Sequence, residues 1–225
     1  MLKKKYLKTC FIIPAYNEQN NISKVILALK KIGNVIVVDD CSQDQTGLIS
    51  KKNEVIVIRH NKNYGYERAL YSGFKKAKKL SFEYIITIDA DGQHFIKDAK
   101  KILVLLHKNY AMVHGKRNQV QRFSEKIFAL YTSFLYGIGD PLCGLKGYNL
   151  KICENYGLLD KKNGIGTNVL LNLKNNNIKT FEVKVSQKKR RDKTRFGGIL
   201  RGNLKIFNVL FQLVAKDLFK KITLK

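Results

Sequence analysis

Short apolar runs that alternate with helix-like segments constrain the fold of this chain more than any other feature. The runs cover residues 10–14, 35–38, 55–58 and 84–88, and helical periodicity covers residues 20–31, 64–79 and 98–108. Such runs are typical of parallel strands, because the helices that connect them cover both faces of the sheet. The sequence therefore predicts a doubly wound α/β fold with a mostly parallel central sheet and ligands at the carboxyl ends of the strands.

The second half of the chain is less regular. It predicts helices over residues 123–136, 166–174 and about 200–220, a turn region over 137–147, a strand over 179–185 and a basic loop over 188–195. The sequence contains no internal repeat and no low-complexity linker. We therefore expect one domain over residues 1–198, followed by an amphipathic C-terminal helix over residues 199–225.

The chain carries a formal net charge of +26, from 43 Lys and Arg residues against 17 Asp and Glu residues. A field this positive favours anionic partners such as nucleic acid, an anionic membrane surface or phosphorylated small molecules. A lysine-rich surface that only keeps the protein in solution is the alternative. The four scattered cysteines suggest a reducing compartment, and no apolar run reaches the roughly 18 residues of a membrane-spanning helix.

Acidic residues follow two of the predicted strands. Asp39 and Asp40 come after the second run, and Asp89 and Asp91 come after the fourth. Because parallel strands end at one edge of a sheet, we expect these side chains to converge on one crevice. Two carboxylates at positions i and i+2 of a turn can bind Mg²⁺ or Mn²⁺, which then bridges to phosphate oxygens. A solvated acidic turn is the alternative. For His94 an ordinary turn histidine is favoured, with a metal or phosphate contact beside the turn as the alternative.

Three motifs occur at the spacing of successive strand–helix units. They read F-I-I-P-A-Y-N-E at residues 11–18, V-V-D-D-C-S-Q-D-Q-T at 37–46 and D-A-D at 89–91. Together they resemble the P-x-Y/F-N-E, V-D-D-G-S-x-D-x-T and D-x-D signatures of the inverting family 2 glycosyltransferases. The resemblance extends over residues 10–118 and implies a single nucleotide-sugar-binding domain of the Rossmann-like GT-A type.

The resemblance also implies roles for the matching residues. The nucleotide-sugar donor is expected to contact Pro14, Tyr16, Glu18, Asp39, Asp40, Asp89, Ala90, Asp91, Gln93 and Arg117. Among these, Asp40, together with the aspartate before it, is expected to hold the base or the ribose. Asp89 and Asp91 are expected to hold Mg²⁺ or Mn²⁺, and Arg117 is expected to face the diphosphate.

The second half resembles one branch of this family, the dolichol-phosphate mannosyltransferases and bacterial polyprenyl-phosphate glycosyltransferases. Residues 140–146 match its D-x-x-x-G-x-[KR] pattern, and residues 190–198 match its basic R-x-x-G-x-S-[KR] loop with one residue fewer. The shorter loop leaves open whether Arg190 or Arg191 takes the first arginine position. The resemblance implies that the acceptor phosphate is held by Arg191, Arg195 and Lys146, and that the catalytic residues are Asp91, Arg117 and Arg195.

The region after these motifs lacks the acidic general base that many family 2 enzymes carry. No Asp or Glu occurs between Asp160 and Glu182. An alcohol acceptor needs a base to take its proton, whereas a phosphate monoester, with a second pKa of about 6, is already nucleophilic at neutral pH. A lipid-phosphate acceptor is therefore favoured, with Asp140, Glu154 and Asp160 left as candidate bases for an alcohol acceptor.

These observations predict metal-dependent transfer of a sugar from a UDP- or GDP-sugar to a dolichyl- or undecaprenyl-type phosphate in the biosynthesis of cell-envelope glycans. The cationic, mostly apolar C-terminal helix predicts a peripheral position on the cytoplasmic face of a membrane, with docking on the core or on a second subunit as the alternative. A surface polysaccharide or a lipid-linked oligosaccharide is the alternative acceptor.

Two alternatives come from other functional classes. The charge and the 11 Tyr and 12 Phe residues also suit a basic nucleic-acid-binding protein without catalysis. We expect no nucleic-acid partner, because no recognised nucleic-acid motif occurs. A catalytically inactive transferase fold at a membrane is the other alternative, and the sequence leaves the oligomeric state open.

Overall fold

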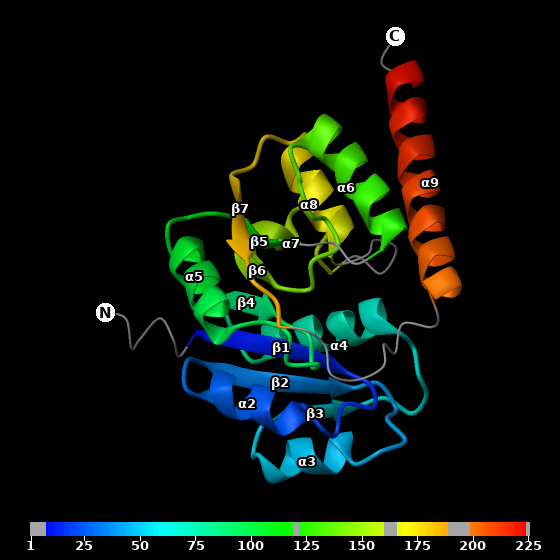
Figure 1. Cartoon of the computed structure of the whole chain (residues 1–225). Coiled ribbons are helices and arrows are strands. Elements are labelled where there is room, and N and C mark those ends of the chain that lie inside the picture. Colours follow the sequence, from blue (N-terminus) through cyan, green and yellow to red (C-terminus); the bar gives the residue numbers. More distant parts are fainter. Residues whose placement is uncertain (1–7, 119–121, 160–165, 189–198, 224–225) are drawn as a thin grey trace.

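The computed structural model describes residues 8–118, 122–159, 166–188 and 199–223 of the chain. A seven-stranded sheet with the order β3-β2-β1-β4-β6-β5-β7 lies at the centre of these residues (Figure 1). The strands are β1 Thr9–Ala15, β2 Asn34–Asp39, β3 Ile56–Arg59, β4 Tyr84–Thr87, β5 Met112–Arg117, β6 Lys146–Asn149 and β7 Thr180–Val185.

One strand interrupts an otherwise parallel sheet. Among the described strands, β6 pairs antiparallel with β4 and with β5, and the other pairings are parallel. Two successive antiparallel pairings restore the original direction, so β1, β2, β4 and β5 end at the same edge. β6 begins at this edge, because Lys146 stands opposite both Thr87 and His114. The predicted α/β fold with a mostly parallel sheet is confirmed.

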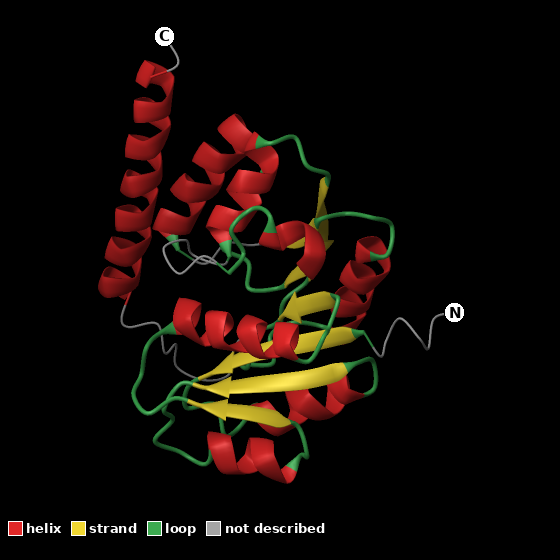
Figure 2. Ribbon diagram, turned by 180° about the vertical axis from the view of Figure 1, so that it is seen from behind, coloured by secondary structure: helices red, strands yellow, loops and turns green. Residues whose placement is uncertain are grey.

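Helices cover both faces of the sheet (Figures 1 and 2). One face carries α2 Ile22–Lys30, α3 Thr46–Lys52 and α5 Ile96–Leu106; the other carries α4 Tyr66–Lys79, α6 Phe123–Tyr136, α7 Leu150–Glu154 and α8 Thr167–Asn175. Phe11 and Ile13 of β1 enter the core under the first group, and Ile12 enters the core under the second. Because neighbouring side chains of a strand point to opposite faces, a strand between two helical layers is apolar at every position.

The last helix, α9 Ile199–Thr223, packs along α6 at the outside of the molecule (Figures 1 and 2). Ser124 Oγ donates to Asn203 near the start of both helices, and Tyr131 and Tyr136 donate to Asp217 further along, at 2.7 and 2.5 Å. The two helices therefore run in the same direction. Within the described ranges, no helix combines the length and the apolar character needed to cross a membrane.

The sequence missed four elements, which are α3, β5, β6 and α7. The turn region predicted over residues 137–147 is also too long, since β6 begins at Lys146. The division into residues 1–198 and 199–225 stays a prediction.

Candidate donor and metal site

The D-x-D turn follows β4 and places Asp89 at the edge where the parallel strands end. The Tyr66 hydroxyl donates to Asp89 Oδ1 at 3.3 Å, and His94 Nε2 donates to Oδ2 at 3.2 Å. Burial raises the pKa of Asp89, but the hydrogen bond from His94 and the charges of Arg117 and Lys146 outweigh it and bring the pKa below the ordinary aspartate value. Asp89 is therefore ionised at neutral pH, while its side chain stays 31% exposed.

Two glycines shape the turn and its surroundings. Gly92 adopts a φ of +71°, a backbone conformation that side chains rarely allow. Gly144 lies against the turn, where a Cβ would stand 2.2 Å from Asp89 Oδ2. Thr87 Oγ1 donates to the Gly144 carbonyl at 2.8 Å and fixes the backbone there. The glycine of the D-x-x-x-G-x-K pattern therefore has a steric cause, because it lets this segment pass Asp89.

Asp91 lies in the same turn and is half-buried, and its Oδ1 accepts the Gln93 N–H at 3.0 Å. Gln93 joins the turn to the segment after β7: the Lys188 N–H donates to its carbonyl at 2.9 Å, and its Nε2 donates to the Lys188 carbonyl at 3.1 Å. The predicted basic loop therefore begins beside the D-x-D turn. Arg191 and Arg195, predicted to contact phosphate, lie outside the described residues.

The two carboxylates of the turn fit a divalent cation. In the part of the chain that the structure describes, no group of three or more His, Cys, Asp and Glu side chains forms a metal cage. Mg²⁺ bound by one or two carboxylates takes its remaining ligands from phosphate oxygens and water. Asp89, ionised and partly exposed, and Asp91 two residues later supply hard oxygen ligands of this kind.

Arg117, at the end of β5, is held by two carboxylates. Its Nε and Nη2 donate to the two carboxylate oxygens of Asp140 at 2.7 and 2.9 Å, and Nη2 also donates to Glu125 at 3.0 Å. Burial lowers the pKa of Arg117, but the bonds to Asp140 and the charge of Glu125 raise it above the ordinary value. With 10% of its side chain exposed, Arg117 acts on Asp89 through its charge. A direct contact with a diphosphate stays a prediction.

Two of the candidate bases are unsuited to that role. Burial raises the pKa of Asp140, but the paired bonds from Arg117 bring it below the ordinary value, so its carboxylate is a weak base. Glu154 pairs with Lys78 at 3.0 Å and ends α7, which follows β6 at the edge opposite the D-x-D turn. Asp160 lies outside the described residues.

Lys146 begins β6 under the D-x-D edge. Its side chain is buried, and its Nζ donates to the Pro141 carbonyl at 2.9 Å. Burial lowers the pKa of Lys146, and the charges of Glu67, Asp140 and Asp89 oppose that shift. Its predicted contact with an acceptor phosphate stays a prediction.

The first motif ends β1 and leads into α2. Pro14 is buried, Tyr16 is half-buried, and the buried Glu18 accepts from Asn21 Nδ2 at 3.1 Å. The Glu18 N–H donates to Thr46 Oγ1 at 2.7 Å, which ties the first motif to the second.

The two aspartates of the second motif are bonded within the protein. Asp39 is fully buried; its Oδ1 accepts the Ser42 N–H at 2.9 Å, and its Oδ2 lies 3.5 Å from Arg59 Nη1. Asp40 Oδ1 lies 2.6 Å from His60 Nδ1. Both carboxylates hold loops in place, and the donor contacts predicted for them stay predictions.

Residues 10–161 match the family described as Glycosyl transferase family 2. The chain belongs to this family. A 32% identical, uncharacterised protein of Methanocaldococcus jannaschii aligns over 92% of this chain and 91% of its own length. The UDP-N-acetylglucosamine–dolichyl-phosphate N-acetylglucosaminyltransferase of Methanococcus voltae is 32% identical over 61% of this chain and 68% of that protein. The undecaprenyl-phosphate 4-deoxy-4-formamido-L-arabinose transferase of Photorhabdus laumondii is 28% identical over 65% of this chain and 50% of that protein.

A solved structure shows the same fold. The glucosyl-3-phosphoglycerate synthase of Mycobacterium tuberculosis, in complex with Mn²⁺, UDP and glucosyl-3-phosphoglycerate, matches with a TM-score of 0.68 and 16% identity. The match covers 92% of this chain and 82% of that one. The predicted GT-A fold, the enzyme class and the resemblance to the polyprenyl-phosphate branch are confirmed.

Sequence reasoning missed two side chains of this glycosyltransferase that hold the predicted aspartates, Tyr66 and His60. His60 directly follows β3, the same signal that identified the aspartates after β2 and β4. Sequence reasoning also did not predict that the His94 side chain is bonded to Asp89. Its buried Nδ1 has no hydrogen-bond partner among the described residues.

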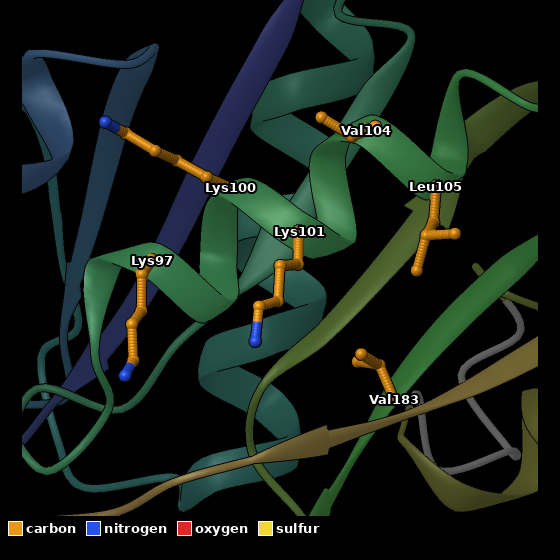
Figure 3. Close-up of a pocket in the computed structure, with 6 residues that line it drawn as sticks. All are labelled: Lys97, Lys100, Lys101, Val104, Leu105 and Val183. Carbon is orange, nitrogen blue, oxygen red and sulfur yellow. The ribbon is translucent and has the colours of Figure 1, made fainter.

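A separate depression lies between α5 and β7 (Figure 3). It is lined by Lys97, Lys100, Lys101, Val104, Leu105 and Val183. The lining includes no carboxylate and none of the predicted site residues, so this depression is distinct from the D-x-D site.

Proposed function

We propose that this glycosyltransferase moves one sugar from a UDP- or GDP-sugar to a polyprenyl phosphate, with Mg²⁺ or Mn²⁺ held at Asp89 and Asp91. The observation that carries the proposal is the ionised, partly exposed Asp89 at the edge where the parallel strands end. Relatives named for dolichyl phosphate and undecaprenyl phosphate support the acceptor. The M. tuberculosis enzyme solved with Mn²⁺ and UDP supports the metal and the donor.

The proposed reaction is a single displacement with inversion. A phosphate oxygen of the acceptor attacks the anomeric carbon, the bond from that carbon to the donor diphosphate breaks, and its electrons leave with the diphosphate. A bound divalent cation supplies charge neutralisation at the diphosphate. Tyr66 and His94 orient the Asp89 carboxylate for this task. Because the acceptor phosphate is already an anion, the reaction needs no base, in keeping with the pairing of Asp140 to Arg117.

Basic side chains near the D-x-D turn are proposed to contact the donor diphosphate and the acceptor phosphate. Arg191 follows Lys188 by three residues, a reach of about 10 Å of extended chain from the D-x-D loop. Arg195 follows in the same loop, and Lys146 lies under the site. Arg117 contributes positive charge near Asp89.

We also propose a peripheral position on the cytoplasmic face of a membrane. Both α6 and α9 expose large apolar side chains: Phe123, Leu130 and Phe134 on α6, and Leu204, Phe207 and Phe211 on α9. On α6, Phe123 and Leu130 each come one position before a residue that is bonded to α9. On α9, the exposed residues each come one position after a residue that faces α6 or the core beneath it. In parallel helices these offsets turn both sets to the same side of the pair. One apolar surface results, and the positive chain suits the anionic lipids of the cytoplasmic leaflet.

The test combines the protein with Mg²⁺ or Mn²⁺, a panel of UDP- and GDP-sugars and a short polyprenyl phosphate. Released nucleoside diphosphate and glycosylated lipid are measured. Metal-dependent lipid product is expected from the wild type and from Glu54→Gln, which alters a carboxylate that is 88% exposed, but not from folded Asp91→Asn.

Each other outcome changes a defined part of the proposal. Donor hydrolysis without lipid product replaces the acceptor by a surface polysaccharide or a lipid-linked oligosaccharide. Full activity of Asp91→Asn removes the metal from the mechanism. Absence of both donor binding and turnover in the wild type overturns the proposed reaction.

A further inference from the structure

The Asp40 carboxylate is almost fully occupied by donors of the protein itself. His60 Nδ1 and the Tyr64 N–H donate to Oδ1 at 2.6 and 2.9 Å, and the Gly65 N–H donates to Oδ2 at 2.7 Å. A carboxylate oxygen accepts about two hydrogen bonds, so Oδ1 is filled and Oδ2 has one position left. With its side chain 5% exposed, Asp40 can therefore accept a single hydrogen bond from a ligand.

The His60 ring is fixed from several sides. Its Nε2 lies 2.8 Å from Ser72 Oγ on α4, its ring meets the Tyr64 ring edge-on at 5.3 Å, and its backbone N–H donates to the Asp39 carbonyl at 2.9 Å. A carboxylate accepts hydrogen bonds, so Nδ1 carries the hydrogen that faces Asp40. These contacts hold that N–H on Oδ1 and keep a ligand from reaching the same oxygen.

Nucleobases differ in the number of donors that they present to a carboxylate. Uracil presents one, its N3–H between two carbonyl oxygens. Guanine presents two side by side, its N1–H and its 2-amino group, which match both oxygens of a free carboxylate. Against Asp40, the uracil donor is satisfied by Oδ2 alone, whereas guanine retains a buried donor without an acceptor, and such a donor is costly.

We propose that His60 makes the donor pocket select uracil over guanine, so that the donor is a UDP-sugar. The inference rests on the proposed function, in which Asp40 holds the base of a nucleotide sugar. His60→Ala frees one acceptor position on Oδ1, beside the bond from the Tyr64 N–H, and so opens the second acceptor that guanine needs. His60→Asn is the matched control. The amide nitrogen of asparagine is bonded to Cγ, as Nδ1 is in histidine, and it keeps an N–H donor at that place.

Calorimetric titration with UDP and with GDP, each in the presence of Mn²⁺, tests this inference. The wild type and His60→Asn are expected to bind UDP about 10- to 100-fold more tightly than GDP. His60→Ala is expected to lose most of that ratio, a change that a general loss of stability does not produce. The wild-type ratio alone decides the base preference if His60→Ala does not fold.

Three outcomes contradict the reasoning in different places. GDP binding as tight as UDP binding in the wild type overturns uracil selection and leaves the proposed transfer reaction in place. An unchanged ratio in folded His60→Ala overturns the role of His60. Failure of the wild type to bind either nucleotide counts against the proposed function itself.

Discussion

Replacing Gly144 by alanine tests whether activity depends on the position of the Asp89 carboxylate. A Cβ at residue 144 would stand 2.2 Å from Oδ2, 2.4 Å from Oδ1 and 2.6 Å from Cγ of Asp89, whereas ordinary contacts begin at 3.4 Å. One group must therefore move by about 1 Å. Thr87 of β4 is bonded to the backbone of residue 144 and holds it in place. The Asp89 carboxylate therefore moves away from its bonds with Tyr66 and His94.

A misplacement of about 1 Å in a catalytic arrangement costs about 100-fold in rate. Gly144→Ala is therefore expected to lower kcat/KM for the nucleotide sugar about 100-fold and to weaken Mn²⁺ binding, followed by electron paramagnetic resonance. Gly166→Ala is the matched control, because a Cβ there meets Lys146 Nζ at 3.4 Å, an ordinary contact. Wild-type kcat/KM and Mn²⁺ affinity in Gly144→Ala would refute this account of the turn.

Three further predictions follow from burial and charge. Burial lowers the pKa of His114 to about 3, so below pH 6.5 the unfolded chain binds a proton that the folded chain excludes. The free energy of unfolding should then fall by up to about 1.4 kcal/mol for each unit that the pH drops between pH 6.5 and 3. Denaturant titrations of His114→Gln should lack this part of the pH dependence. The same pH dependence in wild type and variant contradicts the assignment. Asp140→Asn breaks the buried ion pair with Arg117 and should lower the free energy of unfolding by about 3–5 kcal/mol. Calorimetry should detect a melting temperature lower by about 10 °C, and an unchanged melting temperature contradicts this prediction. Phe134→Ser and Phe211→Ser, 88% and 73% exposed, should each weaken cosedimentation with anionic vesicles about tenfold at unchanged stability, and intact binding removes the proposed membrane surface.

A continuous apolar run in the sequence is typical of a strand whose residues fill both cores. β1 shows this, with Phe11 in one core and Ile12 in the other. β6 has the sequence K-G-Y-N, which carries no such pattern, and it becomes a strand because β4 and β5 pair with it on both sides. Gly147 is required there by distant packing, since a Cβ would stand 2.4 Å from Ile102 of α5. Local patterns do not contain these long-range causes.

Sequence reasoning placed acidic residues at one edge of the sheet, but it did not predict what each side chain contacts. The position of acids after apolar runs placed Asp89 and Asp91 at the sheet edge, because strand direction alone brings them there. The partner of Arg117 was not predictable in this way. Asp140 lies 23 residues later in the sequence, and it meets the guanidinium only because β6 returns the chain to β5.

Exposure separates the aspartates that gather near this edge. The side chains of Asp39, Asp40 and Asp140 are 0%, 5% and 2% exposed, and each is bonded to a donor of the protein, whereas Asp89 is 31% exposed. Burial and bonds within the protein leave Asp40 and Asp140 little capacity for a further ligand, because a new bond mostly replaces an existing one. Asp89 differs, because the neighbours that keep it ionised leave part of it in contact with solvent. We therefore propose that a cation binds at Asp89 with Asp91, while Asp40, with one acceptor position left, is suited to recognise a single N–H group.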